Sequence, residues 1–454
     1  MAKLSSSSLA FTVRRCEPEL VSPAKPTPRE YKLLSDINDQ ESLRFQVPVV
    51  QFYHYNLSMQ GKDPVKVIRD ALAKTLVFYY PFAGRLREGL NGKLMVDCTG
   101  EGVLFIEAGA DVTLEQIGDA LHPPFPCFDE LLYDVPGSDG MLNCPLFFIQ
   151  ITRLKCGGFV FALRMNHVMC DGDGLKQFLS TMAEMAQGTA TPSIPPVWER
   201  HLLDAGEPPR VMCKHNEYDE VEEGAIAFSN NTVERAFFFG RNEFSSLYQL
   251  LPLHLRQCST FELLTACLWR CRTIAINLNP NEEVRMMCIV NARSKFNPPL
   301  PLGYYGNAFV YPAAKATSKQ LCQNPLAYAV ELVKHAKASV TEEYVKSVAS
   351  LMVIKGKKLK FPMHGSFLLS DLKNMGFKEV DFGWDKAEFA GVAKAVGPIS
   401  FVNSAKDKKG EVGVVVSICL PAPVMERFVK ELEKMLMQPN QGDEDRSNLI
   451  SSAL

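Results

Sequence analysis

His167 is the residue of this sequence best placed to do chemistry. Asp171 follows it four residues later, and glycines at 172 and 174 let the backbone bend. The pattern over 159–166 predicts a strand, and apolar residues recur at helical spacing over 175–186. His167 is therefore expected where a strand leaves a sheet and turns toward a helix, a position from which a rigid scaffold can present a side chain to a cleft. An imidazole there is a candidate general base.

A second motif adds specificity, since His-x-x-x-Asp alone occurs often by chance. Asp381-Phe382-Gly383-Trp384 stands in the C-terminal part of the chain. In this order and at this separation, the two motifs resemble those of the plant BAHD family of acyl-CoA-dependent acyltransferases. Segments 23–28, 82–89, 291–294 and 302–308 resemble the alcohol acyltransferase branch, and most strongly its members that benzoylate benzyl alcohol.

The resemblance implies two domains of similar size, each with a chloramphenicol-acetyltransferase-like fold, and a channel between them. Predicted strands and helices are interspersed here without a strict βαβ rhythm, which independently favours an α/β architecture with mixed sheets. We expect an N-terminal domain over 1–188 carrying His167, a crossover linker over 189–224 and a C-terminal domain over 225–454. The linker is the clearest break in composition, because it is rich in proline and ends in an acidic run.

The hydrophobic pattern predicts the main elements. Strands are expected over residues 45–55, 94–98, 102–107, 146–154, 159–166, 233–239, 286–290, 367–369, 399–402 and 412–420. Helices are expected over residues 65–80, 175–188, 326–344 and 424–437. Another helix begins with the capping-box pattern Ser259-Thr260-Phe261-Glu262.

The resemblance also implies roles for residues around the two motifs. Asp171 is expected to point away from the substrate and to pair with an arginine, for which Arg293 is the matching position. Asp381 is expected to be mainly structural and to lie near the CoA channel, with Gly383 and Trp384 as structural support. Trp384 is also expected to border the donor site.

One position departs from the family pattern. The second motif ends in glycine in the family, whereas Asp385 stands here. If this position needs a positive φ, aspartate adopts it more readily than most residues do.

Five residues are candidates for binding CoA. Ser259 and Thr260 lie at a predicted helix start, where backbone donors suit the anionic or polar parts of the ligand, although capping alone explains them equally well. Ser370 and Asp371 match a pair that lines the CoA channel in the family. Asn307 is a candidate for the oxyanion side.

The residues present favour direct transfer, because no activated nucleophile stands out. A thioester is already an activated donor, so the enzyme supplies a base, placement of the two substrates and stabilisation of the oxyanion. The neutral imidazole of His167 would take the proton of the alcohol and later return it to the CoA thiolate. Acyl-CoA is then a co-substrate, and we expect no bound cofactor and no metal, since the metal-ligand spacings are missing.

The expected acceptor is a small apolar alcohol. The strand over 47–51 is largely apolar, whereas family members with polar acceptors place polar residues there. Benzyl alcohol with benzoyl-CoA is the first choice, and an aliphatic alcohol with acetyl-CoA is the alternative. A non-catalytic small-molecule binder on the same fold and a thioesterase are alternatives from other classes. A condensation domain of a carrier-protein system would have a second histidine where Asn166 stands.

Composition sets the remaining bounds. The chain has 454 residues and a net charge of -2, which gives no electrostatic case for nucleic acid or an anionic membrane as partner. Thirteen cysteines without disulfide-like spacing fit a reducing compartment. We find no signal peptide and no transmembrane run, and we expect a cytoplasmic monomer. The tail Ser452-Ala453-Leu454 is a weak match to a peroxisomal tripeptide and leaves that location as the alternative.

Overall fold

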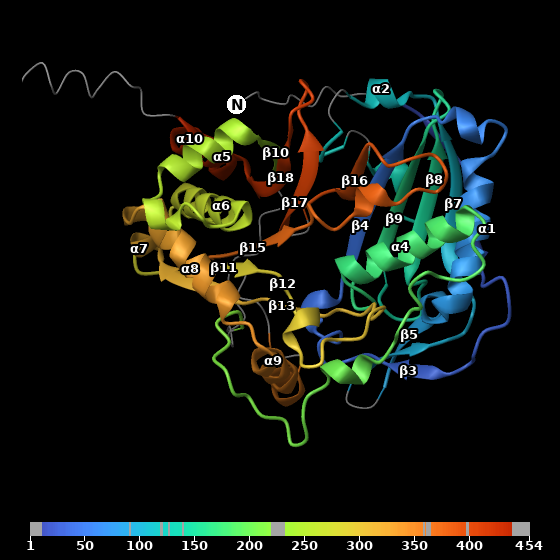
Figure 1. The fold of residues 1–454 in the computed structure, drawn as a ribbon, viewed down its shortest axis with the longest axis horizontal. Coiled ribbons are helices and arrows are strands. Elements are labelled where there is room, and N and C mark those ends of the chain that lie inside the picture. The colour runs from blue at the N-terminus through green and yellow to red at the C-terminus, as the bar shows by residue number, and fades with distance from the viewer. Residues whose placement is uncertain are drawn as a thin grey trace, which may run out of the picture.

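The structure, a computed structural model, describes residues 11–437 apart from 90–91, 119–120, 126–127, 139, 219–231, 357–358, 360–364 and 396–398. Two large sheets dominate it, one built mainly from each half of the chain (Figure 1). Each sheet combines parallel and antiparallel pairs. The predicted α/β class with mixed sheets is therefore confirmed.

The first sheet has seven strands in the order β1-β7-β8-β9-β4-β16, with β2 also paired to β7. Its strands are β1 (Val13–Arg15), β2 (Glu19–Val21), β4 (Gln46–Tyr53), β7 (Val103–Ala110), β8 (Phe147–Arg153), β9 (Phe159–Asn166) and β16 (Phe389–Val392). Helices α1 (Pro64–Phe78) and α4 (Gly172–Ala186) pack side by side and cover one face (Figure 1). Two further helices of this half are short, α2 (Leu114–Ile117) and α3 (Phe128–Leu131).

The second sheet has six strands in the order β10-β18-β17-β15-β11-β14. Its strands are β10 (Thr232–Phe239), β11 (Glu283–Cys288), β14 (Ala313–Thr317), β15 (Ser366–Asp371), β17 (Ile399–Lys406) and β18 (Val412–Pro421). Its helices are α5 (Arg241–Gln249), α6 (Thr260–Ile276), α7 (Ser318–Gln323), α8 (Leu326–Ala338) and α10 (Ala422–Leu436). They form a separate apolar core on the outer side of this sheet, around the fully buried Trp269.

Two small sheets complete the fold. One consists of β3 (Tyr31–Leu33), β6 (Leu94–Asp97) and β5 (Arg85–Glu88), and the other of β12 (Val290–Asn291) and β13 (Phe309–Val310). The remaining helix, α9 (Glu342–Lys355), packs near β13. The crossover between the halves has little regular structure over 189–218, apart from a short 3-10 helix, Arg200–Leu203.

The two halves are joined through one strand and a shared core. Strand β16, although late in the sequence, pairs antiparallel with β4 at the edge of the first sheet, so that Val392 lies opposite Val49. Leu368 and Phe401 of the second sheet belong to the same apolar core as Val47 and other residues of the first half. A site between the sheets is therefore walled by both halves. The domain boundaries at 188 and 224 stay a prediction.

The predicted strands all overlap observed strands. The helices predicted over 65–80, 175–188 and 424–437, and the one predicted to begin at the 259–262 capping box, correspond to α1, α4, α10 and α6. The single long helix predicted over 326–344 was wrong. The chain instead forms α8 and α9 with a break between them, because Thr341 takes an extended conformation and its hydroxyl accepts a hydrogen bond from the Tyr344 backbone N–H at 3.2 Å. Neither α9 beyond residue 344 nor β16 was predicted.

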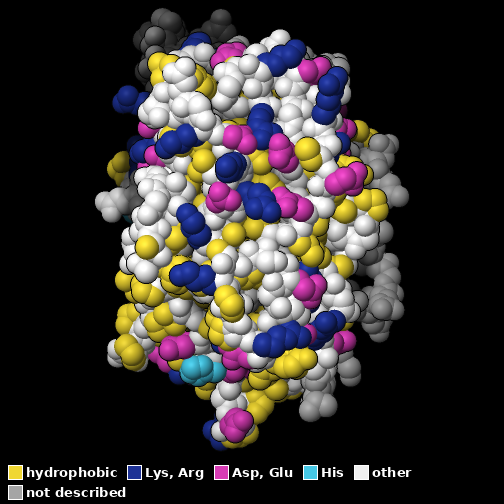
Figure 2. Space-filling model, turned by 90° about the vertical axis from the view of Figure 1, so that its right-hand side faces the viewer, with side chains coloured by type: hydrophobic (Ala, Val, Ile, Leu, Met, Phe, Trp, Pro, Cys, Tyr) yellow, Lys and Arg dark blue, Asp and Glu magenta, His cyan; other side chains and the backbone are white. Residues whose placement is uncertain are grey.

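The surface carries charges of both signs. On the face shown in Figure 2, lysine and arginine side chains are interspersed with aspartate and glutamate, in keeping with the net charge of -2. Within the described part of the chain, none of the helices combines the length and the apolar character needed to cross a bilayer. The predicted tail signal at 452–454 lies outside the described residues.

Candidate active site

His167 lies directly after β9, in a tight turn that leads to α4. Its backbone N–H donates to the Phe45 carbonyl at 2.9 Å. The ring is half-buried between two aromatic rings, with centroids at 5.2 Å for Phe45 and 5.9 Å for Phe309. Since Phe45 precedes β4 and Phe309 belongs to β13, both halves of the chain position the imidazole.

The ring of His167 borders a cavity of about 160 Å³ between the two sheets. Most of the other side chains around it are apolar, and several are aromatic: Phe45, Val47, Val49, Met165, Leu175, Ile289, Phe309, Tyr311, Leu368, Leu372, Met375, Phe377, Val392, Ile399 and Phe401. The polar side chains on its wall are Asp171, Asp173, Asn291, Ser370 and Asp371. The cavity therefore combines one imidazole with a mainly apolar chamber.

The surroundings of His167 favour the neutral imidazole. Burial lowers its pKa below the usual 6.5, and this outweighs the opposing effects of backbone hydrogen bonds and of the Asp171 charge. Nδ1 is buried and has no hydrogen-bond partner among the described residues. A neutral ring at neutral pH can accept a proton, as a general base must.

A pH profile tests this state of the ring. Because burial lowers the pKa of His167, the ring stays deprotonated until the pH falls below 6.5. We expect kcat/KM to be flat near neutrality and to decline only in the acid range, with an apparent pKa below 6.5 in the free enzyme. An acid limb centred above 6.5 would contradict this assignment. The profile should be recorded with the folded fraction monitored at each pH.

Asp171 accepts two hydrogen bonds from Arg293, both of 2.8 Å. Its carboxylate also accepts from the backbone N–H of Gly174 at 3.0 Å, which caps α4, and from that of Ala308 at 2.9 Å. Burial would raise the pKa of Asp171, but Arg293 and these N–H groups lower it. Both carboxylate oxygens are therefore engaged by Arg293 and by backbone N–H groups of the turn and of the facing segment.

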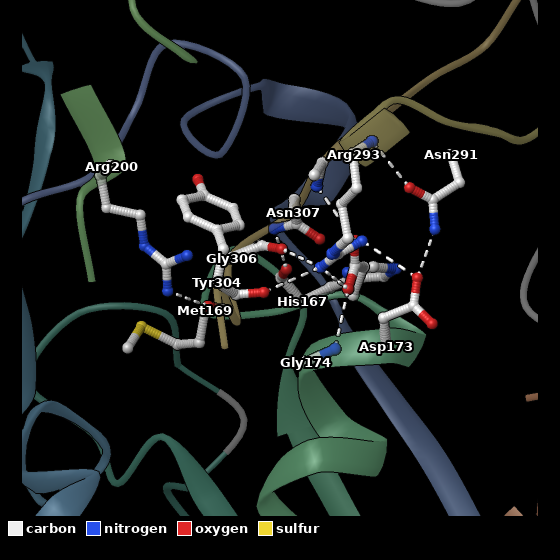
Figure 3. Close-up of polar contacts among 12 residues, drawn as sticks. His167, Met169, Asp173, Gly174, Arg200, Asn291, Arg293, Tyr304, Gly306 and Asn307 are labelled. Atoms are coloured by element: carbon white, nitrogen blue, oxygen red, sulfur yellow. Dashed lines mark hydrogen bonds and ion pairs between the residues drawn. The ribbon is translucent and has the colours of Figure 1, made fainter. Parts of the chain in front are cut away.

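Arg293 anchors a wider network around the turn. It also donates to the carbonyl of Gly306 at 2.9 Å and to Asp173 at 3.0 Å, and Asn291 donates to the same Asp173 carboxylate (Figure 3). Burial raises the pKa of Asp173. The sequence motif ended at Gly172, so Asp173 was missed as a residue of the cavity wall, although its position beside the motif was a usable signal.

The Asp381–Trp384 motif lies in the apolar core. Phe382 is fully buried against the rings of Phe161 at 5.4 Å and Tyr53 at 5.7 Å, and Trp384 packs on Phe159 at 5.3 Å. None of its four residues is on the wall of the described cavity. This placement agrees with a structural role for the motif. Trp384 does not border this cavity, so its expected position beside the donor site stays a prediction.

Two residues in the loop around the motif, Gly383 and Asp385, have positive φ angles. Asp381 accepts a hydrogen bond from the Gly383 N–H at 2.7 Å, and Gly383 has φ +109°. Asp385 has φ 67°, so aspartate here adopts the conformation that a glycine would adopt freely. Its carboxylate also accepts a hydrogen bond from Asn56 at 3.0 Å, which holds the loop end.

Substitution of Gly383 is expected to destabilise this loop. The Cβ of an alanine would lie 2.8 Å from the Met59 side chain, and φ +109° is strained for any L-residue. We expect Gly383→Ala to cost about 1–3 kcal/mol of unfolding free energy, measured by denaturant titration. Asp385→Gly is the matched control, expected to change stability by less than about 1 kcal/mol, because relief of strain opposes the lost hydrogen bond. Equal losses in both variants would contradict the argument.

The structure separates the five candidates for CoA binding. Ser370 and Asp371 are on the cavity wall, and Asp371 pairs with a neighbouring lysine. Ser259 accepts from the Glu262 N–H at 3.2 Å in a complete capping box, and neither Ser259 nor Thr260 borders this cavity. Asn307 is fully buried and donates to the backbone carbonyl of His167 at 2.8 Å (Figure 3).

The sequence matches a known family over almost its full length. Residues 11–435 match the model of the Transferase family. A benzyl alcohol O-benzoyltransferase of Nicotiana tabacum is 61% identical over 456 residues, covering 99% of both chains. Alcohol acyl transferase 1, allele GSa, of Malus domestica is 55% identical over 438 residues, covering 94% of this chain and 95% of that one. The chain therefore belongs to the BAHD family of acyl-CoA-dependent acyltransferases.

Solved structures show the same fold. Vinorine synthase superposes with a TM-score of 0.72 at 20% identity, covering 93% of this chain and 98% of that chain. TRI101 of F. sporotrichioides, solved with coenzyme A and T-2, superposes with a TM-score of 0.69 at 15% identity, covering 88% of this chain and 97% of that chain. These likenesses agree with two domains built on mixed sheets.

Proposed function

We propose that this protein transfers a benzoyl group from benzoyl-CoA to benzyl alcohol, giving benzyl benzoate and CoA. The observation that carries the proposal is the His167 ring on the wall of an apolar, aromatic cavity of about 160 Å³. A cavity of roughly 150 Å³ is large enough to hold one benzene molecule. The Nicotiana relative, a benzyl alcohol O-benzoyltransferase at 61% identity, supports the same donor and acceptor.

The proposed mechanism is direct transfer with His167 as general base. The neutral imidazole takes the hydroxyl proton while the alcohol oxygen forms a bond to the thioester carbonyl carbon. The tetrahedral intermediate then collapses, the C–S bond breaks, and the imidazolium returns the proton to the CoA thiolate. The ring begins and ends neutral, which suits the lowered pKa of His167.

The other residues of the network hold the base in place in this proposal. Asp171 and Arg293 fix the turn, because they bond to each other and to backbone groups nearby, and Arg293 also bonds to the Asp173 carboxylate. Ser370 and Asp371 lie on the cavity wall and are proposed to contact the donor. Asn307 is proposed to act through the His167 backbone, to which it donates, rather than on the oxyanion.

A second candidate is transfer from acetyl-CoA to aliphatic alcohols. The observation that favours it is the 55% identity to an alcohol acyl transferase of Malus domestica. An apolar pocket distinguishes substrates that differ by one methylene by only about 1–3 kcal/mol, so acceptance of several alcohols is expected.

One assay separates these functions. The protein is incubated with benzoyl-CoA or acetyl-CoA, with and without benzyl alcohol or hexanol, and esters, free acids and free CoA thiol are measured. The proposal expects benzyl benzoate to form fastest, with little benzoate released when alcohol is absent. Faster acetylation of hexanol supports the second candidate. Rapid hydrolysis without alcohol supports a thioesterase, and binding without turnover supports a receptor on this fold.

We also propose that CoA acts only as part of the co-substrate, that the chain works as a monomer, and that it works in the cytosol. Size-exclusion chromatography with light scattering tests the oligomeric state. A fluorescent fusion that leaves the C-terminal tripeptide free tests the peroxisomal alternative.

A further inference from the structure

The turn that carries His167 has a feature that the two motifs do not explain. Three successive backbone carbonyls, those of residues 167–169, each accept a side-chain hydrogen bond from a different part of the chain. Asn307 donates to the first at 2.8 Å and Arg200 to the third at 2.8 Å (Figure 3). Asn38 donates to the second at 2.7 Å. We call Asn38, Arg200 and Asn307 the carbonyl clamp.

Arg200 is the member of the carbonyl clamp that comes from the crossover between the halves. It lies in the 3-10 helix Arg200–Leu203 and is only 2% exposed. Its guanidinium lies over the rings of Trp198 at 4.3 Å, Tyr305 at 4.8 Å and Tyr304 at 5.3 Å. Such ring faces stabilise a buried cation, and the planar guanidinium suits them better than an ammonium does.

The contacts of the Arg200 side chain indicate that it binds the backbone of the turn rather than a carboxylate. Within the described residues it has no carboxylate partner, and its Nε and Nη1 atoms make no hydrogen bond. Its Nη2 atom donates to the Met169 carbonyl, and its charge also interacts with the Tyr304 hydroxyl. A buried cation that donates to a carbonyl of the turn beside the base points to a function in holding that turn.

Gly306 makes room for this guanidinium. A Cβ at position 306 would lie 1.4 Å from the Arg200 Nη1 atom, so any side chain there would displace the arginine. Gly306 does not have a positive φ, so its backbone conformation does not require a glycine. The close approach of the guanidinium does. Gly306 therefore offers a way to disturb Arg200 without changing it.

We propose that Arg200 is a positioning residue for the reaction, which fixes the His167 ring through the Met169 carbonyl together with Asn38 and Asn307. Within the turn itself, one backbone hydrogen bond, from Met169 N–H to the Asn166 carbonyl, closes the chain. The direction of the imidazole therefore depends on bonds from outside the turn. The crossover connects the two domains and also contributes Arg200 to the active site. This inference rests on the proposed role of His167.

The test compares full-length variants by steady-state kinetics and thermal unfolding. Arg200→Met removes the cation and the donor, Arg200→Lys keeps the charge but loses the planar group, and Gly306→Ala displaces the guanidinium. Asn38→Leu removes a second member of the clamp. Arg85→Met is the matched control, because Arg85 is also buried and donates to backbone carbonyls, those of Gly84 and Gly102, away from the cavity.

A displaced base lowers kcat and leaves the substrate-binding walls intact, and a misplacement of 1 Å can cost about 10²-fold in rate. We therefore expect Arg200→Met and Gly306→Ala to lower kcat by about 10- to 100-fold with KM for acyl-CoA changed by less than about threefold, and Arg200→Lys to retain more activity. Arg85→Met should lower the unfolding temperature but keep kcat.

Two results would overturn the inference: kcat within twofold of the parent in folded Arg200→Met, or an equal loss of kcat in Arg85→Met. If Arg200→Met does not fold, Arg200→Lys and Asn38→Leu decide by the same criterion. Different results would contradict this inference and the proposed mechanism. If His167→Ala is inactive while folded Arg200→Met has normal kcat, only the positioning role is wrong. If His167→Ala is fully active, the proposed mechanism is wrong.

Discussion

Replacement of His167 by alanine is expected to lower kcat by about 10²- to 10⁴-fold, the range that general-base catalysis contributes. The reason is local. Within the described residues, the cavity wall otherwise offers no second imidazole, only carboxylates, one asparagine and the hydroxyls of Ser370 and Tyr311, and Asp171 is held by Arg293 and two backbone N–H groups. We expect KM for both substrates to change little, because the apolar walls that surround them are untouched.

The measurement is initial-rate kinetics with benzoyl-CoA and benzyl alcohol. His122→Ala is a matched control, since burial also lowers the pKa of His122, but this residue is not on the cavity wall. The control should keep kcat within about twofold, because the His122 side chain does not border the cavity. Undiminished ester formation by His167→Ala would exclude the ring as the base. So would an equal loss in the control, because the effect would then not be specific to the cavity.

Much of the site could be predicted because its parts recur as motifs with fixed spacing. The strand-turn-helix setting of His167 follows from the change in hydrophobic period on either side of it, and the structure has β9, a turn and α4 in that order. The Asp171–Arg293 contact was expected from the family resemblance alone, since nothing in the spacing of two residues so far apart along the chain relates them.

The rest of the site depends on the folded chain and has no local signal. Asn38 and Arg200 act by donating to backbone carbonyls, which every residue possesses, so no pattern of residue types marks the pair. Strand β16 is a short run of four residues whose partner, β4, lies more than three hundred positions earlier. The break between α8 and α9 was missed because the apolar period continues across it, while Thr341 provides a new cap.

Removal of Asp171 is expected to damage folding as much as turnover. Breaking a buried pair leaves an uncompensated charge and costs about 3–5 kcal/mol. The Asp171 and Arg293 side chains are 8% and 21% exposed, so the lower part of this range applies. Asp171→Ala would also remove the cap of α4 and the acceptor of the Ala308 N–H, and thus loosen both chain segments next to His167.

The test pairs urea unfolding with kinetics for Asp171→Ala, Arg293→Ala and the double variant. We expect each single change to lower unfolding free energy and kcat together, and the double change to cost less than the sum of the two, because no lone charge is left. Arg293→Lys is the matched variant that keeps the charge and loses the paired hydrogen bonds. The pKa of Asp171 is lowered by folding, so its contribution to stability exists above the unfolded-state pKa and is lost as the pH falls. An Asp171→Ala protein as stable as the parent, yet without turnover, would show instead that the carboxylate takes part in the chemistry.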